Sequence, residues 1–162
     1  MTRAASRAGL PVTGLELPGT TDTEALGERV AAGLGAGDLV VLAGPLGAGK
    51  TAFVRGLARG LGVRGPVTSP TFVIAREHRP ERPGGVPLVH VDAYRLGLAG
   101  GADVAAELDD LDLDTDLTDA VVAVEWGEGV AERLADRHLL VRLHRREDDV
   151  READVRWVDA AG

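Results

Sequence analysis

The sequence lacks three residue types and contains few of several others. None of its 162 residues is cysteine, asparagine or glutamine, and aromatic residues make up 3%. The absence of cysteine excludes disulfide bonds, thiolate metal sites and cysteine nucleophiles. Four histidines are too few to indicate a metal site built from histidine. No apolar run approaches the roughly 18 residues of a membrane span, and none follows Arg3 and Arg7 as in a secretory signal. We therefore expect a cytoplasmic protein that makes no membrane contact.

Charge is distributed unevenly along the chain. The chain contains 17 arginines but only one lysine, Lys50. We therefore expect that Lys50 has a role that arginine cannot fill. The net charge of −8 comes from residues 103–119, which hold eight acidic residues; elsewhere 18 acidic residues balance 18 basic ones. Such a stretch is usually a solvated surface, and the alternative is a docking patch for a basic partner. The acidic balance argues against binding nucleic acid by charge alone.

The hydrophobic pattern predicts one domain over residues 12–162 behind a flexible tail of residues 1–11. Leu26, Val30 and Leu34 form the apolar stripe of a first helix, for which Thr21 would be the N-cap and Glu24 the capping-box partner. We expect a second helix to start near Thr51 and to end at Gly62. Shorter helices are expected near residues 104–108 and 130–135. Residues 67–75 are expected to be extended, with an interruption at Pro70, and a loop is expected over 76–87. The expected strands are 12–17, 39–43, 88–92, 120–126, 139–144 and 154–158.

These elements predict the fold class. The runs at 39–43 and 120–126 are apolar throughout, which is typical of parallel strands buried on both faces. Residues 139–144 and 154–158 alternate between apolar and polar, as in a hairpin at a sheet edge. We therefore expect an α/β domain with a mixed, mostly parallel sheet, helices on both faces and a C-terminal edge hairpin.

The strongest motif is Gly44–Thr51, GPLGAGKT, which fits the P-loop pattern G-x-x-x-x-G-K-[ST]. Glycines let backbone N–H groups approach phosphate oxygens closely. The following helix adds the positive end of its dipole. Lys50 can reach the β- and γ-phosphates, and the Thr51 hydroxyl is the usual Mg²⁺ ligand. The expected ligands are therefore ATP and Mg²⁺ in a P-loop NTPase domain.

Two other strands end in a carboxylate. Glu125 follows an apolar strand as in a Walker B element, where it could bind Mg²⁺ or orient the attacking water. Asp92 ends the strand 88–92 and competes with Glu125 for the metal, so we leave open which of them touches it. Trp126 could contact the nucleotide or a partner, or lie at the rim. Arg95 could neutralise phosphate charge or pair with Asp92.

Thr68-Ser69-Pro70-Thr71 lies after the P-loop helix, where P-loop proteins often carry a loop that senses the γ-phosphate. The alternative is a turn stiffened by Pro70. The guanine-reading motif N-K-x-D cannot occur, because the chain has no asparagine and its one lysine lies in the P-loop. ATP is therefore favoured over GTP.

Four segments together resemble the TsaE (YjeE) family: GPLGAGKT (44–51), SPTF (69–72), HVDAYRL (90–96) and VVAVEW (121–126). The resemblance covers about residues 12–145. It implies a bacterial ATPase of the tRNA threonylcarbamoyladenosine system. Such proteins work with TsaB and TsaD, which modify adenosine 37 of tRNAs that read codons beginning with A. The TsaE-like partner hydrolyses ATP to reset the complex, and meets tRNA only through it.

The resemblance also implies roles for individual residues. Lys50, Asp92 and Glu125 would be catalytic, and Thr51, Glu125 and Asp92 would serve the metal. The loop of Ser69, Pro70 and Thr71 would act as a switch. The residues expected to bind the nucleotide are Thr23, Pro45, Leu46, Gly47, Ala48, Gly49, Lys50, Thr51, Ala52, Thr71 and Trp126. No arginine finger is placed, so we expect slow turnover without partners, with Arg95 or a partner's arginine as candidates.

The sequence departs from the family at two points: Pro45 stands where many relatives have an acid, and Gly127 stands where proline often follows. The region after Arg145 matches poorly. Two other functions remain open. A small-metabolite kinase would need an arginine-bearing lid, for which the loop 76–87 is the candidate. An ATP-bound scaffold that does not hydrolyse would tolerate loss of Glu125.

Overall fold

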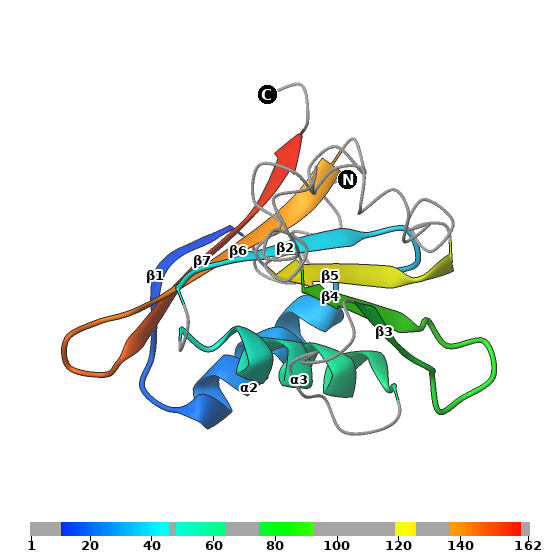
Figure 1. Cartoon of the computed structure of the whole chain (residues 1–162), viewed down its shortest axis with the longest axis horizontal. Coiled ribbons are helices and arrows are strands. Elements are labelled where there is room, and N and C mark those ends of the chain that lie inside the picture. The colour runs from blue at the N-terminus through cyan, green and yellow to red at the C-terminus, as the bar shows by residue number, and fades with distance from the viewer. Residues whose placement is uncertain (1–10, 46–47, 64–74, 93–118, 126–136, 160–162) are drawn as a thin grey trace, which may run out of the picture.

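A seven-stranded sheet carries two helices on one face in the computed structural model, which describes residues 11–45, 48–63, 75–92, 119–125 and 137–159 (Figure 1). The helices are α2 (Thr20–Ala31) and α3 (Lys50–Leu61). The strands are β1 (Val12–Leu17), β2 (Leu39–Ala43), β3 (Ala75–His78), β4 (Leu88–Asp92), β5 (Val121–Glu125), β6 (Arg137–Arg145) and β7 (Arg151–Asp159).

The sheet is parallel at its centre and antiparallel at both sides. Its strand order is β1-β7-β6-β2-β5-β4-β3. The pairs β2–β6, β2–β5 and β4–β5 are parallel, whereas β1–β7, β6–β7 and β3–β4 are antiparallel. The expected mixed α/β fold is therefore confirmed. The C-terminal hairpin forms as expected, but it lies one strand in from the edge because β1 pairs with β7.

The central strands are apolar because both of their faces are covered. Every residue of β2 and of β5 is buried. On the helix side Leu42, Val121 and Leu139 pack with Phe53 and Leu57 of α3 in one core. Burial of this kind stabilises the fold by about 25 cal/mol per Å² of apolar surface. Among the described helices, none has the length and apolar character needed to cross a membrane.

Helix α2 differs from its expected form at both ends. Its N-cap is Gly19 rather than Thr21, and Asp22 rather than Glu24 completes the cap by accepting a 2.8 Å hydrogen bond from the Gly19 N–H. Glu24 instead pairs with two arginines of α3. The helix ends at Ala31, before the expected Leu34, because glycines at 33 and 35 disfavour further helix.

The expected loop at 76–87 begins as a strand. Residues 76–78 belong to β3, which pairs antiparallel with β4. That pairing explains the error: the sequence shows no apolar alternation there, since β3 is an edge strand with exposed Arg76 and Glu77. Other expectations lie outside the described residues: the tail apart from residue 11, the segment 67–74 and the helices at 104–108 and 130–135, so helices on the second face are not tested.

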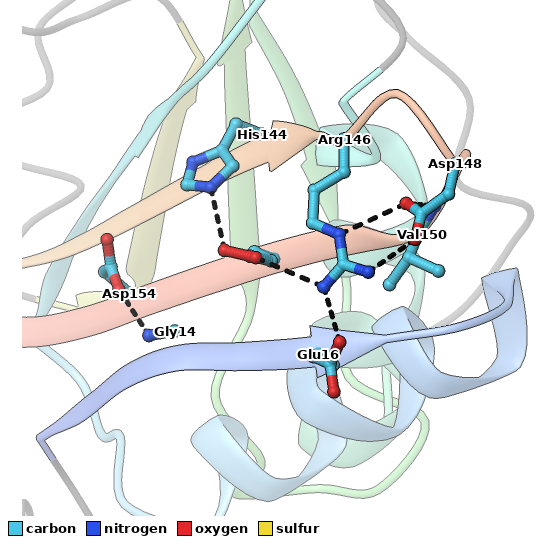
Figure 2. A network of polar contacts seen from close by, with 8 residues as sticks. Gly14, Glu16, His144, Arg146, Asp148, Val150 and Asp154 are labelled. Atoms are coloured by element: carbon cyan, nitrogen blue, oxygen red, sulfur yellow. Dashed lines mark hydrogen bonds and ion pairs between the residues drawn. The ribbon is translucent and has the colours of Figure 1, made fainter.

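Arg146 ties the β6–β7 turn to β1 (Figure 2). Its guanidinium contacts Glu16 of β1, Asp148 of the turn and Glu152 of β7. These carboxylates hold the Arg146 pKa above its ordinary value, and Arg146 in turn lowers the Asp148 pKa. Figure 2 also shows the Gly14 N–H donating to Asp154 at 2.7 Å. Charged contacts therefore join the edge strand to the hairpin at two places.

Candidate functional site

The site lies at one edge of the sheet, where three central strands end. β2 ends at Ala43 and leads directly into the glycine-rich loop. β5 ends at Glu125, which is the register partner of Leu42 on one side and of Asp92 on the other. Since neighbouring strands lie about 4.8 Å apart, the parallel pairing places the backbone of Glu125 one strand from the end of β2 and that of Asp92 two strands from it. This is the edge at which open α/β sheets bind ligands.

Gly44 starts the loop in a backbone conformation that only glycine adopts readily. Its φ is 143°, and a Cβ at this position would lie 2.2 Å from the carbonyl oxygen of Leu143 in β6. A side chain here is excluded both by backbone strain and by contact with the neighbouring strand. The chain therefore turns away from the sheet close against β6.

Lys50 is the first residue of α3, and its side chain is directed back over the loop. The residue is 5% exposed, and its Nζ donates a 2.5 Å hydrogen bond to the carbonyl oxygen of Gly44. This contact links the start of α3 to the first residue of the loop. A buried ammonium group at this place is an anchor for an anion.

The N-terminus of α3 has no side-chain cap. Its N-cap is Gly49, with a φ of 106°. Thr51 and Ala52 occupy the first turn and are half-buried, and Ala48 is buried with its N–H donating to the Pro45 carbonyl at 3.1 Å. A helix N-terminus without a capping side chain, with glycine before it, suits a bound phosphate.

Thr23 of α2 lies against this loop. It is 2% exposed, and its Oγ1 lies 3.9 Å from the position that a Cβ on Gly49 would occupy. Helix α2 is held in place by ion pairs from Glu24 to Arg55 and Arg59, at 3.2 and 2.5 Å. Hydrogen bonds from these arginines lower the Glu24 pKa. The resemblance predicts that Thr23 binds the nucleotide, and the residue lies beside the glycine loop.

Glu125 is buried and has a partner in the neighbouring strand. One of its oxygens, Oε2, lies 2.5 Å from Nε2 of His90 in β4. His90 is 0% exposed and Glu125 is 5% exposed. No role was predicted for His90, although it belongs to the segment HVDAYRL. The available signal was strand alternation, because His90 lies two residues before Asp92, the acidic residue that ends β4.

Arg151 is the other residue that the sequence did not place near the site. It begins β7, and its Cγ lies 3.9 Å from the Cβ position at Gly49. Its guanidinium donates to the Asp149 carbonyl at 3.0 Å. No sequence motif marks this residue, because only the pairing of β7 with β6 brings it to this edge.

Several expected site residues cannot be compared. Pro45, at the surface, is described and lies in the loop, and Asp92 is placed only through its backbone register. The expected site residues outside the described part of the chain are Leu46, Gly47, Ser69, Pro70, Thr71, Arg95 and Trp126.

The donor set fits a nucleotide with Mg²⁺. A buried lysine, a glycine turn and an uncapped helix N-terminus are groups that hold phosphates. A hydroxyl at Thr51 and a carboxylate at Glu125 are oxygen ligands of the kind that Mg²⁺ takes together with substrate phosphates. In the ranges that the structure describes, no cluster of three or more potential metal-ligating side chains is present.

Comparison with known sequences gives a consistent result. A sequence model of the family described as "Threonylcarbamoyl adenosine biosynthesis protein TsaE" matches residues 17–153. The chain is 58% identical over 157 residues to the tRNA threonylcarbamoyladenosine biosynthesis protein TsaE of Mycobacterium tuberculosis, covering 96% of this chain and 94% of that protein. The protein of the same name from Bacillus subtilis is 39% identical over 132 residues, covering 81% and 77%.

A solved structure is similar as well. The crystal structure of Bacillus subtilis YdiB superposes with a TM-score of 0.65 and 32% sequence identity. The match covers 86% of this chain and 81% of YdiB. The likeness therefore extends over most of both molecules.

Proposed function

This chain belongs to the TsaE family of threonylcarbamoyl adenosine biosynthesis proteins, and we propose that it serves tRNA modification as a magnesium-dependent ATPase. Family membership supports a nucleotide-binding P-loop protein in this pathway. The observation that supports the proposed ATPase activity is the position of Lys50. Its buried Nζ reaches across the glycine loop to the Gly44 carbonyl. When phosphates occupy the loop, the same ammonium group can turn to them.

Different residues of the site bind the phosphates, the Mg²⁺ ion and the attacking water. The loop from Gly44 to Gly49 and the first turn of α3 bind the phosphates, and Lys50 neutralises their charge. Thr51 and one of the two strand-end carboxylates, Asp92 or Glu125, hold Mg²⁺, which supplies charge stabilisation at the transferred phosphoryl group. The other carboxylate orients the attacking water.

The remaining members of the site enter as parts of the same proposal. In this proposal Thr23 contacts the nucleotide from α2, the loop of residues 69–71 responds to the γ-phosphate, and Trp126 binds the nucleotide. We propose that the domain comprises residues 12–162. The partners are TsaB- and TsaD-like proteins, and tRNA is met only through their complex in the cytoplasm. The names of the relatives place those proteins in threonylcarbamoyladenosine biosynthesis, which supports this choice.

Steady-state ATP hydrolysis by the purified protein tests this function, with and without TsaB and TsaD from the same cell. The variants are Lys50→Ala, which removes the phosphate anchor, and Glu125→Ala, which removes the strand-end carboxylate. We expect slow turnover alone, an increase with the pair, and loss in both variants while their thermal unfolding stays cooperative. Loss of a group that acts only in the transition state lowers kcat by about 10²–10³.

Three results would contradict the proposal in different ways. An ATP hydrolysis rate that is the same with and without TsaB and TsaD contradicts the accessory role. Transfer of the phosphoryl group to a metabolite instead of water supports the kinase alternative, which is weakened because β3 occupies the start of its expected lid at residues 76–78. The non-hydrolysing scaffold is supported if the wild type shows no turnover and if Glu125→Ala still binds both ATP and the partners fully.

A further inference from the structure

His90 and Glu125 share one side of the sheet. The register of the parallel strands pairs His90 of β4 with Ala123 of β5. Glu125 lies two residues beyond Ala123, and side chains two apart on a strand point to the same face. The imidazole and the carboxylate therefore meet across the two strands, with Nε2 2.5 Å from Oε2.

Both side chains are removed from water, so each depends on the other for a polar partner. His90 is fully buried and the Glu125 side chain is 7% exposed. The second ring nitrogen of His90, Nδ1, is buried and has no hydrogen-bond partner among the residues that the structure describes. If the residue at position 90 only filled the core, leucine would be more favourable than histidine, because leucine leaves no buried nitrogen without a hydrogen-bond partner. The polar contact to Glu125 is thus the feature that distinguishes His90 from an apolar residue.

The contact fixes the arrangement of the carboxylate. A carboxylate oxygen accepts hydrogen bonds and an imidazole N–H donates them, and Nε2 is the ring nitrogen of His90 that faces Glu125. An N–H on this nitrogen donates to Oε2 and so restrains the rotation of the carboxylate. Oxygen Oε1 is then the one left for another ligand at the strand end.

We propose that His90 is a positioning residue, which holds Oε2 of Glu125 so that Oε1 is presented to Mg²⁺ or to the attacking water. This inference rests on the proposed ATPase function. Partners that orient a ligating or catalytic carboxylate in this way are worth about 10- to 100-fold in metal affinity or activity. His90 itself touches neither nucleotide nor metal.

Two substitutions of His90 and a control separate positioning from packing. His90→Leu fills the space without a donor, and His90→Gln restores an N–H donor at a similar distance. Val89→Ala is the matched control, because Val89 is a 4% exposed neighbour on the same strand that points to the opposite face. Each protein is measured for its unfolding temperature, its ATP affinity in EDTA, the Mg²⁺ concentration that half-saturates hydrolysis, and kcat and KM for ATP.

We expect His90→Leu to bind ATP in EDTA like the wild type and to keep the KM for ATP within about twofold. Its kcat should fall by about 10- to 100-fold, or its half-saturating Mg²⁺ concentration should rise by that factor. His90→Gln should recover most of the loss, and Val89→Ala should show none. Equal kcat and Mg²⁺ dependence in His90→Leu and Val89→Ala would overturn the inference while leaving the ATPase function in place.

A readout without activity covers the case in which His90→Leu does not fold. Long-range ¹H–¹⁵N spectra of the wild-type imidazoles report which ring nitrogen carries the proton, and the chain has only four histidines to assign. We expect a proton on Nε2 of His90, and a changed Nε2 signal in Glu125→Ala. A ring protonated only on Nδ1 would overturn the inference. If the wild type neither binds nor hydrolyses MgATP, the proposed function fails and this inference falls with it.

Discussion

A Cβ atom on Gly56 would lie 1.8 Å from the carbonyl oxygen of Glu24. Helices α2 and α3 thus touch through their backbones at this point, and no side chain fits between them. The contact is reinforced by the ion pairs from Glu24 to Arg55 and Arg59. Because α2 also carries Thr23, the position of this residue at the glycine loop depends on how closely the two helices approach.

Gly56→Ala should therefore affect both stability and nucleotide binding. The added methyl group forces the helices apart, which we expect to lower the free energy of unfolding by about 1–3 kcal/mol. ATP affinity should fall with it, because Thr23 moves away from Gly49. Gly35→Ala is the control, since a Cβ there meets nothing within 4 Å. Denaturant unfolding and calorimetric ATP titration would contradict this account if the two variants behaved alike.

The hydroxyl of Thr23 is expected to contribute one hydrogen bond to the bound nucleotide. Thr23→Val keeps the shape of this buried side chain but removes the hydroxyl. We expect ATP affinity to fall by about 1 kcal/mol, roughly fivefold in Kd. Thr23→Ser keeps the hydroxyl and should bind within about twofold of the wild type. Equal Kd values for Thr23→Val and the wild type would remove Thr23 from the site.

Asp38 provides a test of pH dependence. Burial raises the pKa of this carboxyl above its ordinary value of 3.8, although the Gly35 N–H donates to it at 2.8 Å. A pKa raised by folding means that the protonated form is favoured in the folded state. The corresponding contribution to stability is present below pH 3.8 and is lost as the pH rises through the folded-state pKa.

Asp38→Asn should consequently be at least as stable as the wild type at pH 7. Asparagine keeps an oxygen that accepts from Gly35 but carries no charge into the partly buried site. The advantage of the variant should shrink as the pH falls through the raised folded-state pKa toward 3.8, and it should stay constant below that. Thermal unfolding of both proteins between pH 3 and 7 measures this difference, and a wild type that is clearly more stable at neutral pH would contradict it.

Arg146 should act mainly through charge. Its partners Glu16, Asp148 and Glu152 lie near the surface, where ion pairs contribute little and are screened by salt. Arg146→Ala should lower the unfolding temperature at low salt, and the difference should shrink at about 1 M salt. Arg156→Ala is the control, because the structure gives Arg156 no ion pair within the described ranges. A salt-independent loss in Arg146→Ala would point to packing instead.

Local sequence patterns predicted the centre of the fold, because its elements are determined by residues that are adjacent in the sequence. The apolar runs of β2 and β5 and the glycine that ends α3 are each read from a few adjacent residues. The errors in the sheet arose where the pairing of separate strands decides the structure. β1 covers β7, and β3 pairs with β4, although neither pairing leaves a mark in the sequence.

The candidate site follows the same rule. Lys50 and Glu125 were predicted from motifs, because a phosphate loop and a strand-end acid have fixed spacing along the chain. The contact of His90 with Glu125 and the position of Arg151 near Gly49 were not predicted, since each depends on strand register between segments far apart in sequence. Register is set by the whole sheet, so a motif cannot report it.

Repeated rounds of tRNA modification test the central claim most directly. TsaB, TsaD, substrate tRNA and a supplied threonylcarbamoyl donor are combined with ATP and either the wild-type chain or Lys50→Ala, and modified adenosine is counted per TsaD. We predict many rounds with the wild type and about one round or fewer with Lys50→Ala, together with loss of its ATP hydrolysis. Equal modification with both proteins, or without this chain, would contradict the account.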